Sequence, residues 1–157
     1  MRLKEFRTKA VVLLASGYAG MDEEERADVA HTIQAVANPP EVRILGPKCL
    51  GFMVPSINLY ASIAHAKALP GRIAFISQSD SLYTAVLDWA MSQGIGFSHI
   101  VSLGSRLDVG FSDILDYLAS DPLTRSILLY VESTHDARAF MSAARAASRN
   151  KPVVVMR

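Results

Sequence analysis

A serine-rich turn between an apolar run and a helical pattern is the segment best suited to chemistry. Residues 72–76 form a short apolar run that follows Pro70-Gly71, and this pattern predicts a buried strand. The turn after it consists of Ser77, Gln78, Ser79, Asp80 and Ser81. A helix that opens from such a turn can hold an anion, because free N–H groups and the helix dipole meet at its N-terminus. From spacing alone, a capped strand–helix connection without a ligand is the preferred interpretation.

A second candidate is the turn that opens the segment GPKCLG, and its residues are Gly46, Pro47, Lys48 and Cys49. Two glycines and a proline allow a backbone to approach a ligand closely. The alternative is a simple turn after a strand, with the cysteine as a small buried side chain, and spacing alone favours it. Ser16 and Gly17 follow another apolar run, at a sheet edge where open α/β folds bind ligands. A turn that needs small residues explains them equally well.

The elements that position these turns alternate between strand and helix along the chain. Strands are predicted at residues 10–16, 42–45, 72–76, 98–103, 126–131 and 152–156. Helices are predicted at residues 22–37, 81–93, 111–119 and 136–149. Residues 52–70 lack a long periodic pattern and are interpreted as a linker with a short strand near residues 59–63. On the second helix, Leu82, Ala85, Val86 and Trp89 form the expected core stripe. This alternation is typical of an α/β fold with a parallel sheet.

Composition narrows the classes of function. Sixteen basic residues against 15 acidic ones give a net charge of +1, which argues against a nucleic-acid surface. No apolar run has the ~20 residues of a membrane span, so no membrane partner is expected. Cys49 is the only cysteine, which excludes an internal disulfide and fits a reducing cytoplasm. The histidines, at positions 31, 65, 99 and 135, lack ligand spacing, so no metal site is expected.

The serine-rich turn resembles the SQSGALG-type loop of the NDP-forming acyl-CoA synthetases, which are relatives of the succinyl-CoA synthetase α subunit. The similarity continues through LDWAMSQGIGFSHIVSLG, LDYLASDPLTRSILLYVES and DARAFMSAARAASRNKPVVVMR, with RILGPKCLGFMVP upstream. It covers most of the chain from about Lys9. The last segments are also similar to the synthetase-like part of bacterial protein lysine acetyltransferases. The resemblance implies a partial Rossmann-like CoA-binding unit over residues 1–66 and a flavodoxin-like, doubly wound parallel-sheet unit over residues 67–157.

The resemblance also implies roles for individual residues. GPKCLG is similar to the family's GPNCLG turn at the CoA site, with Lys48 in place of the usual asparagine. Ser16 and Gly17 match a family loop at the carboxyl edge of the sheet. The turn from Ser77 to Ser81 matches the loop whose helix stabilises a phosphorylated histidine. Asp80 stands there in place of a glycine, so we expect it to cap the helix and to exclude phosphate.

Four residues beyond these turns also have expected roles. Tyr83 brings bulk where the family pattern prefers a small residue, which supports a loss of the phosphate role. Glu132, after an apolar strand, resembles a glutamate that faces the active histidine and is the one catalytic candidate. Arg106 and Asp108 follow another strand and could form a surface ion pair.

The implied function is that of a fragment or degenerate relative of an NDP-forming acyl-CoA synthetase, an acid–thiol ligase. CoA or acyl-CoA is the expected cofactor, while nucleotide and Mg²⁺ belong to an ATP-grasp part that this sequence lacks. The phosphohistidine segment is also absent, so the chain alone should not complete the reaction. Both ends look cut within a domain, and the missing early Rossmann units predict weak CoA affinity.

Two alternatives remain open. One is a non-catalytic acyl-CoA-sensing segment of a lysine acetyltransferase, with the acetyltransferase domain as its partner. The other is an interaction module that pairs through exposed sheet edges. Such edges also predict a homo-oligomer, because dimerisation is a common way to cover them.

Overall fold

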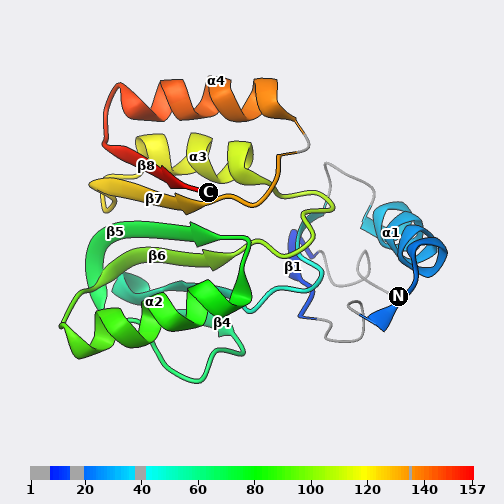
Figure 1. The fold of residues 1–157 in the computed structure, drawn as a ribbon, viewed down its shortest axis with the longest axis horizontal. Helices are drawn as coiled ribbons and strands as arrows, with labels where there is room; N and C mark the ends of the chain where they lie inside the picture. The colour runs from blue at the N-terminus through cyan, green and yellow to red at the C-terminus, as the bar shows by residue number, and fades with distance from the viewer. Residues whose placement is uncertain (1–7, 15–19, 38–41, 135) are drawn as a thin grey trace.

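A six-stranded mixed sheet forms the centre of the protein. The computed structural model describes residues 8–14, 20–37, 42–134 and 136–157 (Figure 1). The strands lie in the order β4 (Leu59–Ser62), β3 (Gly51–Val54), β6 (Phe97–Ser102), β5 (Pro70–Ser77), β7 (Ser126–Tyr130) and β8 (Val153–Met156). The last four are mutually parallel, whereas β3 is antiparallel to both β4 and β6. The protein is therefore a mixed α/β protein with a mainly parallel sheet.

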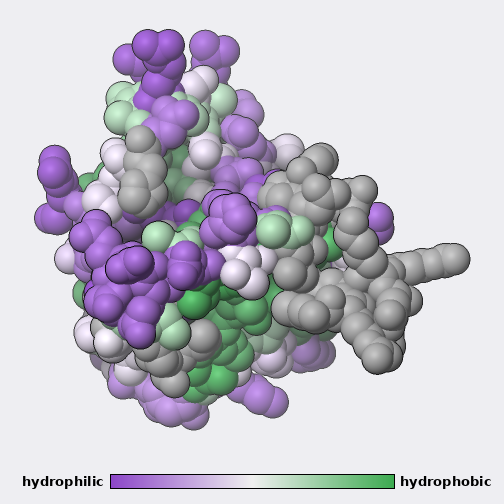
Figure 2. All heavy atoms as spheres, turned by 90° about the vertical axis from the view of Figure 1, so that its right-hand side faces the viewer, coloured by the Kyte–Doolittle hydropathy of each residue, from purple (hydrophilic) through white to green (hydrophobic). Residues whose placement is uncertain are grey.

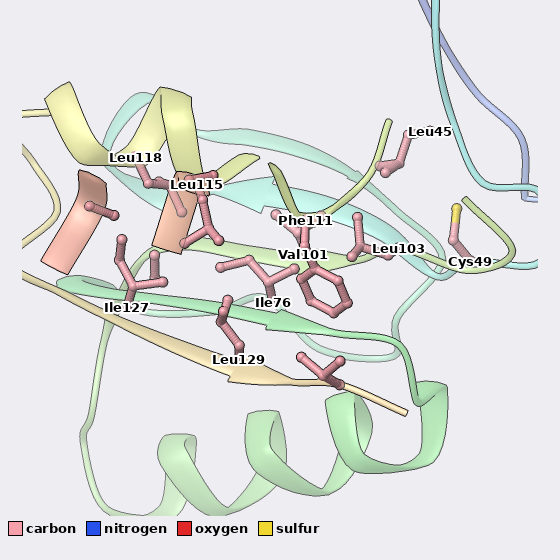
Figure 3. Packing of buried hydrophobic residues seen from close by; sticks show 14 residues of the cluster. Leu45, Cys49, Ile76, Val101, Leu103, Phe111, Leu115, Leu118, Ile127 and Leu129 are labelled. Atoms are coloured by element: carbon pink, nitrogen blue, oxygen red, sulfur yellow. The ribbon is translucent and has the colours of Figure 1, made fainter. Parts of the chain in front are cut away.

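Helices cover both faces of this sheet. Figure 1 shows α3 (Phe111–Ser120) and α4 (Ala137–Ser148) together above β7 and β8, with α2 (Asp80–Ser92) below β5 and β6. On the α3 side, Ile76, Ile127 and Leu129 from the strands pack against Leu115 and Leu118 (Figure 3). Each of these five side chains is fully buried. Their burial stabilises the sheet–helix contact, because apolar area removed from water contributes about 25 cal/mol per Å².

A smaller unit adjoins the carboxyl end of the large sheet. It consists of β1 (Ala10–Val12) and β2 (Arg43–Leu45), which are parallel, and of α1 (Glu23–Ala37). The loop after β6 joins the two sheets through backbone hydrogen bonds. Val109 N donates to Ile44 O at 3.0 Å, and Leu107 N donates to Gly46 O at 3.2 Å. These hydrogen bonds hold the GPKCLG turn beside the end of β6.

Most predicted elements from residue 70 onward are confirmed to within about two residues. One strand differs: the run predicted at residues 10–16 is a strand only over β1, with Leu13 and Leu14 beyond it and residues 15–16 outside the described part. The linker interpretation of residues 52–70 is wrong over β3, although β4 confirms the short strand near residues 59–63. β3 begins at Gly51 and ends just before Pro55, so its four residues are too few to show an alternation of apolar and polar side chains. Its pairing with β6 is a long-range contact that local pattern does not reveal.

The buried stripe of α2 also differs from the prediction. Tyr83, Leu87 and Ala90 are buried, whereas Trp89 is 60% exposed. These three buried positions follow helical spacing of four and three residues, and Trp89 lies on another face. The apolar residues of α2 cover more than half of its circumference, opposite a polar side made of Asp80, Ser81, Thr84, Asp88 and Ser92, so the sequence allows more than one buried stripe. Tyr83, the bulky residue near the start of α2, is fully buried in the core.

The division of the chain into units at residues 66 and 67 stays a prediction. The β3–β4 hairpin is hydrogen-bonded into the six-stranded sheet, beside strands that the sequence placed in the second unit. Among the helices of the described segments, none is long and apolar enough to cross a membrane.

Candidate functional site

A polar pocket of about 310 Å³ lies where four loops meet, and we call it the polar pocket. Its lining residues are Lys48, Gln78, Ser79, Asp80, Ser81, Gly104, Ser105 and Glu132. The loops follow β2, β5, β6 and β7, and the arrowheads of β5, β6 and β7 in Figure 1 point to the same side. Open α/β sheets bind ligands at the carboxyl ends of their strands, and this pocket occupies that position. Figure 2 views the molecule from this end and shows many hydrophilic side chains above and to the left of a hydrophobic area.

The loop that opens α2 is organised by two serines. Ser77 is fully buried at the end of β5, where its hydroxyl donates to Ser79 O at 2.8 Å and accepts from Ser79 N at 3.0 Å. Ser79 is the N-cap, because its hydroxyl accepts a hydrogen bond from Leu82 N at 3.2 Å. The expectation that Asp80 caps the helix is therefore wrong: it is the first helical residue. Ser77 shapes the turn, and Ser79 satisfies one of the helix's free N–H groups.

The Asp80 carboxylate instead ends a short hydrogen-bond chain across the sheet edge. Leu50 N donates to the Ser102 hydroxyl at 3.1 Å, and that hydroxyl donates to the Asp80 carboxylate at 2.6 Å. The negative charge thus lies at the positive end of α2, where the helix dipole favours it. Asp80 also lines the polar pocket, so it places an anionic group beside the free N–H groups at the start of α2.

The GPKCLG turn approaches the pocket through two residues with positive φ angles. Gly46 has a φ of +96°, and a Cβ atom there would lie 2.6 Å from Leu13 O. The Gly46–Pro47 peptide is cis, and Lys48 has a φ of +55°. Lys48 is exposed and lines the pocket, whereas Gly46, Pro47 and Cys49 are buried behind it. Only the lysine of this turn is therefore available to an anionic ligand in this conformation.

Cys49 behaves as a buried structural side chain. It is 3% exposed, and its Sγ lies 3.5 Å from Leu13 O. Desolvation raises the pKa of this thiol, with Asp80 adding to the rise. A thiol whose pKa is raised is a poor nucleophile at neutral pH. The interpretation of Cys49 as a small buried hydrophobe is confirmed.

Gly104 and Ser105 also line the polar pocket, and the sequence analysis did not select them. Ser105 N donates to Pro47 O at 2.8 Å. Gly104 has a φ of +60°, and a Cβ atom there would overlap the backbone oxygens of Pro47 and Lys48. A glycine is therefore required for the close approach of the two loops. In the sequence, the feature that could have pointed to them is Gly104, the glycine of the SLG segment, which directly follows a predicted buried strand.

Glu132 lies at the rim of the pocket and is held through its backbone. The Gln78 side-chain oxygen accepts from Glu132 N at 2.6 Å and from Ser133 N at 3.1 Å. These bonds join the loop after β5 to the loop after β7. The Glu132 side chain is exposed. Burial lowers the pKa of Arg106, and the charge of Glu132 only partly opposes this decrease. Arg106 Nη2 donates to the Ser133 hydroxyl at 3.0 Å.

The expected ion pair between Arg106 and Asp108 is not formed. Asp108 pairs with Arg43 at 3.0 Å and accepts a hydrogen bond from Ile44 N at 2.7 Å. Arg43 also pairs with Asp113 at 2.7 Å. The loop runs along β2, which brings Asp108 to the strand and turns it away from Arg106. This cluster fastens the small sheet to the start of α3.

The structure thus brings together half of the twelve site residues that the sequence selected. Six of them line the polar pocket: Lys48, Gln78, Ser79, Asp80, Ser81 and Glu132. Ser16 and Gly17 lie outside the described residues. Within the described segments, no three His, Cys, Asp or Glu side chains are grouped as metal ligands. One cationic and two anionic side chains line the pocket, so its charge alone does not favour an anion.

Comparison with known proteins identifies the family. Residues 70–157 match the model of the succinyl-CoA ligase-like flavodoxin domain. The chain belongs to this family of NDP-forming acyl-CoA synthetases. It is 40% identical over 151 residues to an ADP-forming acetate–CoA ligase I of Archaeoglobus fulgidus, covering 95% of this chain and 22% of that protein. It is 35% identical over 149 residues to the α subunit of ADP-forming acetate–CoA ligase I of Pyrococcus furiosus, covering 95% and 32%.

Solved structures agree with this assignment. A Pyrococcus horikoshii protein superimposes with a TM-score of 0.91 at 30% identity, covering 98% of this chain and 35% of that one. The dinucleotide-forming acetyl-coenzyme A synthetase 1 of Ca. Korarchaeum cryptofilum, in complex with phosphate and ADP, gives a TM-score of 0.88 at 30% identity, covering 98% and 33%. The chain thus spans about a fifth to a third of the length of these relatives.

Proposed function

We propose that this chain forms the CoA-binding part of an NDP-forming acyl-CoA ligase. Such an enzyme joins a carboxylic acid to the thiol of CoA and converts a nucleoside triphosphate into a diphosphate and phosphate. The observation that carries the proposal is the polar pocket, in which the GPKCLG turn, the Ser77–Ser81 loop and Glu132 meet although they are distant in the sequence. The family membership supports the same assignment.

Lys48 is the residue proposed to meet CoA. Its backbone is fixed by the packing of Gly104 against the turn, and its exposed ammonium group can pair with a phosphate of CoA. The surrounding turn presents backbone rather than reactive side chains, because Cys49 is buried. Ser16 and Gly17 remain proposed as further contacts of CoA.

Glu132 and the N-terminus of α2 are proposed to face the phosphorylated histidine of the ligase. No histidine lines the polar pocket, so that group has to come from outside the residues described. Nucleotide and Mg²⁺ would be held by an ATP-grasp part, on the same polypeptide or on a partner subunit. The 157 residues by themselves would therefore not complete the reaction.

One observation favours the second candidate, a non-catalytic acyl-CoA-sensing segment of a lysine acetyltransferase. Asp80 places a carboxylate at the helix end that the family uses for phosphate, and Ser102 holds it there at 2.6 Å. A pocket that keeps CoA contacts and loses phosphate contacts suits a sensor. Binding of CoA without any response to phosphate would support this candidate.

We also propose that the chain self-associates through a sheet edge. β8 is an edge strand among the described strands, and Val154, Val155 and Met156 on it are 40–49% exposed. Edge strands with apolar side chains tend to pair with other chains. A sedimentation measurement at high concentration should detect a dimer, which Val154→Lys should weaken; a strict monomer would contradict this part.

Calorimetric titration with CoA and acetyl-CoA tests the main proposal. We expect a dissociation constant weaker than about 1 µM, and Lys48→Ala should weaken it about threefold to tenfold, as expected for one charge-assisted contact. Lys67→Ala is the matched control, because Lys67 is also exposed but lies over the Tyr60 ring at 5.0 Å, outside the pocket lining. Equal affinities of the wild type and Lys48→Ala would contradict the proposed role of the turn.

A further inference from the structure

A second hollow, which we call the apolar pocket, has no assigned role. It has a volume of about 360 Å³ and lies between the β3–β4 hairpin, the 3-10 turn η2 (Pro55–Ile57), β6 and α3. Phe52, Val54, Val101 and Ile114 form part of its apolar wall, and it shares no lining residue with the polar pocket. Its size falls within the range of small-molecule sites. Ring side chains on its wall, His99 and Tyr117, meet edge to face at 5.5 Å.

His99 is the polar group of this wall, and one edge of its ring is occupied. The residue is 6% exposed. Its Nδ1 lies 3.5 Å from the Thr124 hydroxyl oxygen and 3.7 Å from the Asp121 carboxylate. The Thr124 hydroxyl donates its proton to Asp121 at 2.5 Å and also lies 2.8 Å from the Ser98 hydroxyl, so toward Nδ1 it offers only a lone pair, beside the Asp121 carboxylate. This arrangement fixes the proton of a neutral imidazole on Nδ1.

The other ring nitrogen is therefore an acceptor without a partner. Desolvation lowers the pKa of His99, the nearby Asp121 opposes this, and Lys151 adds to the lowering, so the ring is neutral at pH 7. In the neutral ring with a proton on Nδ1, Nε2 carries a lone pair. Nε2 has no hydrogen-bond partner among the described residues. Nε2 is not among the fully buried side-chain atoms that lack a partner, so water can reach it, and a ligand hydroxyl would take the place of that water.

We propose that the apolar pocket binds a small, largely apolar molecule that carries one hydroxyl group, with this hydroxyl donating to His99 Nε2. The apolar walls supply affinity through buried area, and the Nε2 acceptor of His99 supplies orientation. An anion is disfavoured, because the lone pair of Nε2 and the carboxylate of Asp121 both repel negative charge. Phenolic or alicyclic alcohols have the required chemistry.

The test uses phenol and toluene, which share a ring and differ in the hydroxyl, with the full 157-residue chain. Phenol should move the Nε2 resonance of His99 in a nitrogen-detected histidine spectrum, and toluene should not. The phenol-to-toluene ratio of affinities should fall about threefold to tenfold in His99→Phe, the effect of one neutral hydrogen bond. The wild-type spectrum keeps the test valid if His99→Phe does not fold.

Three results would overturn the proposal. The first is a spectrum that shows the proton on Nε2 in the free protein. The second is the same affinity ratio in the wild type and in His99→Phe. The third is a combination of two findings: the wild type forms a dimer that Ile57→Lys dissociates, and phenol does not bind the resulting monomer. In that case the pocket would be a contact surface between two copies of the chain. Ile57 suits this variant, since it is 64% exposed at the pocket wall.

Discussion

The polar pocket and the apolar pocket belong to one molecule but are held by different forces. Loop backbones build the polar pocket: Gly104 lies against the GPKCLG turn, and Gln78 binds two N–H groups after β7. Side chains build the apolar pocket, and a chain of hydrogen bonds from Asp121 through Thr124 orients His99. A backbone-built site tolerates changes of side chain but fails when a glycine gains one. A site that is built from side chains should instead be damaged by substitutions of those side chains.

Gly104→Ala should have the largest effect on the polar pocket. A non-glycine residue at a φ of +60° is strained, and the new Cβ would overlap two backbone oxygens. We expect a loss of about 2–4 kcal/mol in the free energy of unfolding, measured by urea denaturation. Gly94→Ala is the control, because its φ is +67° but no atom lies within 4 Å. That variant should lose only about 1 kcal/mol, and equal losses would refute the close-approach argument.

Asp121→Asn should affect the apolar pocket next most strongly. The carboxylate accepts from Thr124 at 2.5 Å and from Leu123 N at 3.2 Å. Desolvation raises the pKa of Asp121. The two hydrogen bonds, together with the charges of His99 and Lys151, lower it by more, so the net change is a decrease. We expect a cost of about 1–3 kcal/mol at pH 7, as for a buried group that loses a partner.

The pH dependence supplies the check on this prediction. Because the folded pKa lies below the unfolded value of about 3.9, the carboxylate's contribution is present above that pH and is lost as pH falls through the folded pKa. In urea denaturation, the difference in unfolding free energy between the wild type and Asp121→Asn should therefore become smaller as the pH falls from 7 to 3. Asp88→Asn is the control, because its 2.6 Å contact with His65 is largely exposed. A difference in unfolding free energy that stays constant with pH would contradict the stabilising role of the Asp121 carboxylate.

Asp80→Asn should have the smallest effect on stability and a specific effect on anions. The amide keeps an acceptor for Ser102 but removes the negative charge at the start of α2. Phosphate at several times its dissociation constant should then stabilise the variant by about 1 kcal/mol, or about 2–4 °C in melting temperature. The wild type should not respond. If phosphate raises both melting temperatures equally, Asp80 does not block an anion site.

The polar pocket could be predicted from the sequence because its residues follow strands. Apolar runs before Ser77 and Glu132 located the strand ends, and parallel strands place such ends together. The resemblance added Lys48. The N-cap assignment failed at Asp80, since Ser79 and Asp80 are both good caps and only the geometry chooses between them.

The apolar pocket could not be predicted, for three physical reasons. β3 is too short to show a period, and its partner β6 begins more than 40 residues later. The tautomer of His99 depends on Thr124, which reaches it only through the fold. The exposure of Trp89 shows the same limit, because an apolar arc that covers more than half of a helix does not reveal which part of it is buried.

The most direct test of the central claim is a backbone amide spectrum of the ¹⁵N-labelled chain during titration with CoA. The account predicts that the amide signals of Lys48, Ser79 and Gly104 shift together and saturate with one dissociation constant. Signals of Arg138 and Arg145 on α4, an exposed cationic face, should move little. If the pocket signals stay fixed up to about 1 mM CoA, a free energy of about −4 kcal/mol, or if only the α4 signals move, the polar pocket is not the CoA site.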